Sequence, residues 1–69
     1  MILSFISVVD SINEEGWVCF AEKPGAYRIV NGPEDVEKTI RQALHHGNAI
    51  EVFYKADTMT IDDALPWRG

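Results

Sequence analysis

The sequence predicts an α+β fold, in which one helix packs on one face of a curved, mainly antiparallel sheet of four to five strands, in the order β-β-β-α-β-β. Three observations support this prediction. Segments with strand-like alternation are apolar in both alternating sets of side chains. The segment 33–46 has apolar residues at helical spacing. The connections between neighbouring strands are too short for crossovers, which favours antiparallel pairing.

The first expected strand covers Ile2–Ile12. One alternating set of its side chains contains Ile2, Ile6, Val8 and Ile12, and the other contains Leu3, Phe5 and Val9. Asn13 to Gly16 then suit a type I turn followed by a left-handed glycine. We therefore expect a hairpin between the first strand and the second.

The second expected strand runs from Trp17 to about Lys23 and is also apolar on both sides. Trp17, Cys19 and Ala21 form one set, and Val18 and Phe20 form the other. Pro24 and Gly25 suit the two central positions of a type II turn, which would lead into a short third strand at Tyr27–Val30.

The helix is expected over Pro33–His46, because proline suits the first helical position and Gly47 is a good left-handed terminator. Its apolar stripe consists of Val36, Ile40, Ala43 and Leu44. The opposite side is charged, and Glu37 and Arg41 are spaced for an ion pair along that surface.

A fourth strand is expected over Ala49–Lys55, with Ile50, Val52 and Tyr54 on one side and Phe53 on the other. A turn at Ala56 and Asp57 leads to a fifth strand at about 58–62. Pro66 should end regular structure. We therefore expect one domain over residues 1–64 and a C-terminal tail over residues 65–69.

One helix can shield only one side of this doubly apolar sheet. The chain has 69 residues, and a domain of this size buries only about 60% of the surface of its unfolded form. We therefore expect the second sheet face to be buried in a homodimer, which is the commonest closed oligomer. The alternative is a monomeric, partly closed barrel with the helix at one end.

The chain is acidic, with 11 Asp and Glu against 6 Lys and Arg and a net charge of −5. It has no cluster of basic residues, so we expect no nucleic-acid partner. The first charged side chain is Asp10, and the apolar start is too short to span a bilayer. With one cysteine, Cys19, the composition predicts a cytoplasmic protein that does not act at a membrane.

Adjacent His45 and His46 suggest a metal site, with Asp57, Asp62 or Asp63 as oxygen ligands. Neighbouring helical side chains point about 100° apart, so the two imidazoles are poorly placed to chelate one ion. The aspartates lack the alternation and the central glycine of a calcium loop. We therefore expect no metal.

Cys19 and a histidine are the residue types of a thiol nucleophile and its base. A reactive thiolate needs an electropositive, partly exposed setting, whereas Cys19 lies between Val18 and Phe20 in an apolar run. We therefore expect Cys19 to pack as a small apolar side chain, and we expect neither a catalytic residue nor a cofactor.

These observations favour a small acidic binding or regulatory protein without enzymatic activity. It would self-associate or dock on a protein partner through an apolar sheet face and the C-terminal tail. Tryptophan and other large apolar side chains are frequent interface anchors. The candidate interface residues are Trp67, Leu65, Trp17, Phe5 and Phe53. The alternatives are an acidic inhibitor or immunity-type protein that neutralises a basic partner, and a protein that binds a small ligand.

Overall fold

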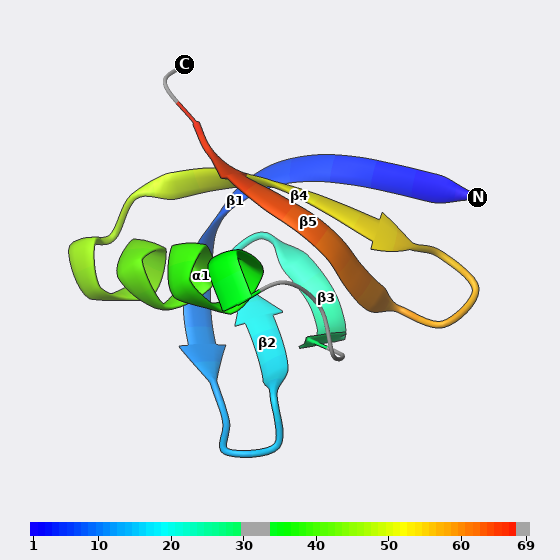
Figure 1. Ribbon diagram of the computed structural model, residues 1–69, viewed down its shortest axis with the longest axis horizontal. Helices are drawn as coiled ribbons and strands as arrows, with labels where there is room; N and C mark the ends of the chain where they lie inside the picture. The colour runs from blue at the N-terminus through cyan, green and yellow to red at the C-terminus, as the bar shows by residue number, and fades with distance from the viewer. Residues whose placement is uncertain (30–33, 68–69) are drawn as a thin grey trace.

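The computed structural model describes residues 1–29 and 34–67 (Figure 1). Its elements are β1 (Ile2–Ile12), β2 (Trp17–Phe20), β3 (Lys23–Ile29), α1 (Glu34–His46), β4 (Ala49–Lys55) and β5 (Thr60–Pro66). The predicted small α+β fold, with one helix and a mostly antiparallel five-stranded sheet, is confirmed. The bounds of β1 and β4 are those expected from the alternation of their side chains.

The five strands form a closed barrel in the order β1-β2-β3-β5-β4. Strand β1 is long enough to pair with two partners, β4 along Ile2–Val8 and β2 along Val9–Ile12. A bulge between Val9 and Ser11 bends the strand where it passes from one partner to the other. The barrel closes where β3 and β5 pair in parallel, at Arg28–Thr60 and Ile29–Ile61. Closure covers one face of every strand with the same chain.

A five-stranded barrel with this strand order, and with its helix between the third and fourth strands, has the connectivity of an OB-fold. Connectivity alone identifies a fold and not an activity. The strand order also determines which side chains face the barrel interior and which face outward.

The inward set of β1 is Phe5, Ser7 and Val9, each less than 9% exposed. Phe5 and Val9 join apolar side chains of the other strands in one core cluster. Phe5, Phe20, Tyr27 and Tyr54 meet within this cluster, with ring centroids 4.9–5.6 Å apart. The T-shaped and tilted contacts among these rings contribute to stability beyond the burial of apolar area.

Helix α1 packs against β1, β4 and β5. Its buried side chains are Val36, Ile40 and Ala43, and they belong to the same core cluster as the barrel interior. Leu44, the fourth member of the expected stripe, is 36% exposed. At the helix end, Gly47 has a φ of 70° and donates its amide hydrogen to the Ala43 carbonyl at 2.8 Å, which confirms the expected terminator. The expected first helical residue, Pro33, lies outside the described residues.

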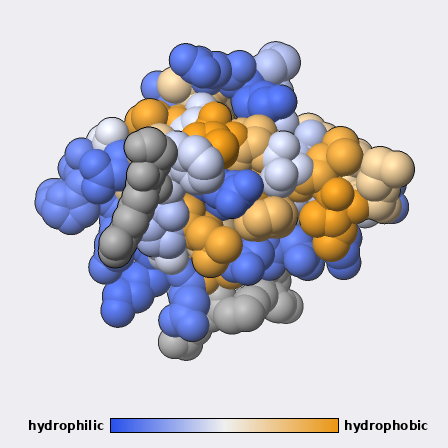
Figure 2. Space-filling view, turned by 90° about the horizontal axis from the view of Figure 1, so that it is seen from above, coloured by the Kyte–Doolittle hydropathy of each residue, from blue (hydrophilic) through white to orange (hydrophobic). Residues whose placement is uncertain are grey.

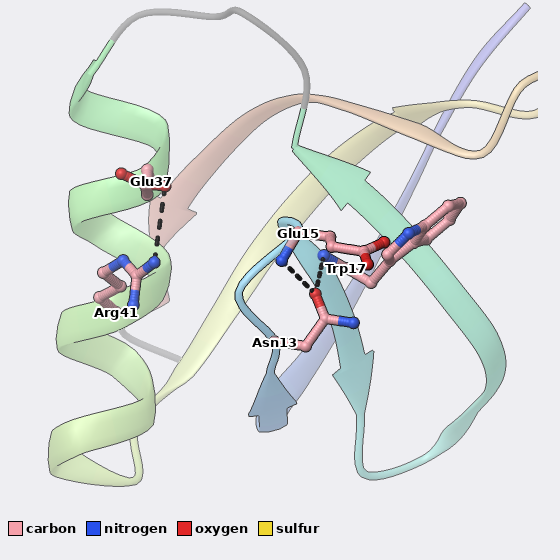
Figure 3. Close-up of polar contacts among 5 residues, drawn as sticks. All are labelled: Asn13, Glu15, Trp17, Glu37 and Arg41. Atoms are coloured by element: carbon pink, nitrogen blue, oxygen red, sulfur yellow. Dashed lines mark hydrogen bonds and ion pairs between the residues drawn. The ribbon is translucent and has the colours of Figure 1, made fainter.

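The β1–β2 connection is the turn that the sequence predicts, with Gly16 at a φ of 88°. The amide hydrogen of Gly16 bonds to the Asn13 carbonyl at 3.2 Å. The side-chain oxygen of Asn13 accepts hydrogen bonds from the amides of Glu15 and Trp17, each at 2.9 Å (Figure 3). Asn13 therefore fixes the turn with both its backbone and its side chain.

The expected turn at Pro24 and Gly25 is wrong in position. The chain reverses at Ala21 and Glu22, because Phe20 pairs with Lys23, and β3 begins earlier than expected. Pro24 and Gly25 instead lie within β3, where the register between Val18 and Phe20 shifts. A proline and a glycine with a φ of 86° still interrupt the pairing, but they do so as a bulge.

Strand β5 begins and ends later than expected and includes Leu65 and Pro66. Leu65 pairs with Glu51, and Pro66 pairs with Ile50. The Trp67 amide donates to the Ala49 carbonyl at 3.3 Å, so the position of the missing Pro66 N–H points away from β4. Among the described residues, strand β3 pairs only with the start of β5, so within that part of the chain proline removes no hydrogen bond from the sheet at this edge.

Candidate docking surface

The outward side chains of β1, β4 and β5 form a partly exposed apolar surface. We call it the outer apolar face and define it by Ile2, Ile6, Val8, Ala49, Phe53, Leu65 and Trp67. The four largest exposures are 50% for Ile2, 42% for Ile6, 45% for Leu65 and 45% for Trp67. Figure 2 shows hydrophobic side chains gathered over these strands, with hydrophilic side chains among them.

The register of the strands arranges this face in rows. Ile6 lies opposite Glu51, and Glu51 lies opposite Leu65, so these three side chains are neighbours across three strands. In the next row, Phe53 lies opposite Ser4 on one side and opposite Asp63 on the other. Carboxylates are therefore placed directly between or beside the apolar groups.

A groove of about 340 Å³ lies beside the end of β5. Helix α1 contributes Gln42 and His46, and the start of β4 contributes Ala49 and Ile50. Trp67 forms part of the wall, held in place by the hydrogen bond from its amide to the Ala49 carbonyl. Because Trp67 belongs to both, the groove adjoins the outer apolar face.

A second hollow, of about 500 Å³, lies on α1 itself and is lined by charged and polar residues of that helix. His45 and His46 border it, with ring centroids 5.0 Å apart and ring planes at 79°. Glu37 and Arg41 form the expected ion pair there, at 3.7 Å between Oε1 and Nη2 (Figure 3). In the described part of the chain, no three His, Cys, Asp or Glu side chains gather around a common metal position.

The barrel interior holds two tyrosines in contact, with ring centroids 4.9 Å apart. Burial raises the pKa of Tyr27 above 10.0, and the charge of the neighbouring Tyr54 and its hydrogen bond raise that pKa further. Across residues 1–29 and 34–67, every buried side-chain nitrogen or oxygen has a hydrogen-bond partner.

The structure brings three of the candidate interface residues together: Leu65, Trp67 and Phe53 lie on the outer apolar face. Trp17 lies on β2, where the Arg28 guanidinium is 5.5 Å from the centroid of its ring. Phe5 lies inside the barrel and is 8% exposed. Cys19 is half-buried rather than part of the core cluster.

Sequence reasoning left Ile2, Ile6 and Glu51 out of the candidate interface. Ile2 and Ile6 belong to one alternating set of β1, but both sets are apolar, so the pattern does not say which set faces inward. Ser7 belongs to the same alternating set as Phe5 and also faces inward. A polar side chain in the inward set makes it harder to predict from the sequence which side of β1 is buried. Glu51 lies between Ile6 and Leu65 because β4 pairs with β1 and β5 in this register. The sequence of β4 alone does not predict that register.

No protein-family model, curated protein or solved structure matches this chain. No helix in the described ranges is long and apolar enough to cross a membrane.

Proposed function

We propose that the protein is a small acidic binding protein without enzymatic activity, and that it forms a protein interface with the outer apolar face. The observation that carries this proposal is the grouping of four large, half-exposed apolar side chains on one side of the barrel: Ile2 and Ile6 on β1, Leu65 on β5, and Trp67 directly after β5. Contiguous exposed apolar surface of this kind is typical of interaction sites. Tryptophan at the edge of such a surface is a frequent anchor.

The apolar contacts alone do not give a stable complex. Fully burying one such side chain contributes roughly 1.5–3 kcal/mol. Because Ile2, Ile6, Leu65 and Trp67 are each about half exposed, covering all four contributes roughly 3–6 kcal/mol. Association costs about 4–15 kcal/mol in lost translational and rotational freedom. The interface therefore needs polar contacts in addition to the apolar ones.

The partner that covers the face is a second copy of this chain or a different protein. The binding takes place in the cytoplasm, because a lone cysteine suits a reducing environment. An acidic inhibitor of a basic partner is one form of this function, and the net charge of −5 favours it.

Native mass spectrometry of the chain isolated from its own cells tests the proposal. We expect the wild-type chain to carry a second polypeptide, and the Leu65→Ser variant to lose it because serine removes a central apolar contact. The control is Glu22→Gln, which changes an exposed residue in the β2–β3 turn and should leave the complex intact. A bare monomer for the wild type, or equal complexes for all three chains, contradicts the proposal.

A second candidate, binding of a small molecule, is favoured by the groove beside Trp67. Its volume of about 340 Å³ lies at the lower end of the range for ligand pockets. The groove combines the Trp67 ring with the polar side chains of Gln42 and His46. In the same mass spectra, a retained small-molecule mass that Trp67→Ala removes and Leu65→Ser keeps would support this candidate.

A further inference from the structure

The charges on the outer apolar face restrict the chemistry of its partner. Glu51 lies between Ile6 and Leu65, and Asp63 lies beside Phe53. Lys55 is on the same strand as Glu51 but pairs with Ile2 at the far end of the face. The rows that contain Leu65 and Phe53 therefore carry negative charge and no cation among the described residues.

Glu51 has neither an ion pair nor a side-chain hydrogen bond within residues 1–29 and 34–67. Asp63 differs, because its carboxylate accepts a hydrogen bond from the Ala64 amide at 2.8 Å. Glu51 is already half-buried. It is therefore the carboxylate that depends most on what covers the face.

A partner that covers Ile6 and Leu65 must also cover Glu51, because adjacent strands are only about 4.8 Å apart. Removing a carboxylate from water without supplying a counter-charge opposes binding more strongly than one apolar contact favours it. The partner therefore has to place a cation between the two apolar contacts.

A second copy of the chain satisfies this requirement poorly in a two-fold dimer. In such a dimer the same patch meets itself, so the cations that the other copy can offer to Glu51 are those of the face itself. The nearest cation of the face, Lys55, lies two rows away from Glu51, beside Ile2. The net charge of −5 adds repulsion between copies.

Arginine suits this position better than lysine. Its guanidinium is flat and weakly hydrated, and it binds a carboxylate through two parallel hydrogen bonds. It also tolerates apolar neighbours on both sides, which is the environment that Ile6 and Leu65 provide for Glu51.

Resting on the proposed function, we propose that the outer apolar face binds a segment of a different protein in which an arginine is flanked by apolar side chains. The arginine pairs with Glu51, and the apolar side chains pack on Ile6 and Leu65.

The probe for this proposal is a library of random dodecapeptides displayed on phage and selected against the immobilised wild-type protein. We expect the selected peptides to carry arginine with apolar neighbours. A selected peptide, made synthetically, should lose about tenfold or more in affinity for the Glu51→Gln variant, since one unit of log affinity corresponds to 1.4 kcal/mol. A copy with citrulline in place of arginine should bind weakly and equally to both proteins.

Two control variants locate the effect. Glu22→Gln removes an exposed carboxylate in the β2–β3 turn and should leave the affinity unchanged. Leu65→Ser should lower the affinity for the arginine peptide and for the citrulline peptide by the same factor, because it removes an apolar contact and no charge. Amide chemical shifts of labelled protein then show whether the peptide lies on β1, β4 and β5.

The outcomes separate this inference from the proposed function. Peptides that bind these strands without arginine, and that Glu51→Gln does not affect, overturn the inference and leave the proposed function standing. A dimer of the protein that Leu65→Ser dissociates also overturns the inference and leaves the proposed function standing, because the face then binds a second copy of the chain. Peptides that shift only other surfaces, or a selection that yields no peptide, overturn the inference and remove support for the face as an interface.

Discussion

Tyr27 is the residue whose environment most clearly departs from that of the free side chain. Its pKa is raised above 10.0, first by burial and then by Tyr54. A raised folded-state pKa means that the neutral hydroxyl stabilises the fold below pH 10.0 and that this contribution is lost as the pH rises through the folded-state value. The barrel should therefore lose stability in alkali.

We expect the free energy of unfolding in urea to fall as the pH rises above 10.0 in the wild type, and to fall less in Tyr27→Phe, which has no proton to lose there. Urea titrations of both proteins on either side of that pH measure the difference. Parallel pH profiles for the two proteins would show that ionisation of Tyr27 is not coupled to folding.

Val52 and Phe53 are neighbours in β4 with opposite orientations. Val52 is fully buried, while Phe53 is half-buried and faces Asp63. Val52→Asp should prevent folding, because it buries an unpaired charge at a cost of several kcal/mol. Phe53→Lys should remain folded, because its ammonium group lies opposite Asp63. Circular dichroism with thermal melting distinguishes the two, and a cooperative melt for Val52→Asp would mean that the strand faces are assigned wrongly.

Trp67 is expected to matter more for binding than for folding. Its side chain is 45% exposed, so Trp67→Ala should cost the fold about 1.5 kcal/mol or less. Removal of an anchor aromatic side chain from an interface typically costs about 2 kcal/mol or more. Urea unfolding and affinity for a selected peptide should be measured on the same preparation. A large loss of stability without a loss of affinity would place Trp67 in the fold rather than in the interface.

At the scale of the elements, glycines at positive φ shape the β1–β2 turn and the bulge within β3. Gly16 has a φ of 88°, and a Cβ there would lie 3.3 Å from the Ile29 carbonyl oxygen. Gly25 has a φ of 86°, but nothing lies within 4 Å of a Cβ at that position. The two sites share the backbone conformation and differ in the space around it.

Gly25→Ala should cost about 1 kcal/mol through its backbone conformation alone. Gly16→Ala should cost more, because the alanine must also displace the Ile29 carbonyl. Chemical denaturation of both variants gives the two free energies. Equal costs would show that the contact with Ile29 relaxes freely.

The elements also show what the sequence can and cannot predict. β1 and β4 are segments rich in apolar side chains with clear ends, and their bounds are predicted correctly. The Asn13–Gly16 turn is predicted because its chemistry is local. The predictions made from Pro24 and Pro66 are wrong, because a proline fits a bulge or a free strand edge as well as a turn or the end of a strand.

At the scale of the whole molecule, the sequence does not predict whether the sheet closes into a barrel. Closure requires β3 to pair with β5 across the intervening helix, and the described residues contain two residue pairs between these strands. No local pattern encodes this contact. Both alternating sets of β1 are apolar, so the sequence is compatible with an open sheet covered by a second copy and also with a closed barrel. The candidate surface residues Leu65 and Phe53 are adjacent only because β4 and β5 pair in the observed register.

The closed barrel buries one set of strand side chains and leaves part of the other set on the surface. That second set, on β1, β4 and β5, combines apolar groups with the carboxylate of Glu51, which has no ion-pair partner within residues 1–29 and 34–67. The connectivity of the fold positions this surface, while the choice of side chains on it determines what it binds.

Site-specific photo-crosslinking in the cells of origin tests the central claim most directly. A photoreactive p-benzoylphenylalanine replaces Leu65 in one chain and, as a control, the exposed Glu22 in another. Our account predicts one covalent adduct of defined mass from position 65 and little or none from position 22. Absence of an adduct at position 65, or the same adducts from both positions, would contradict the assignment of the outer apolar face as a protein interface.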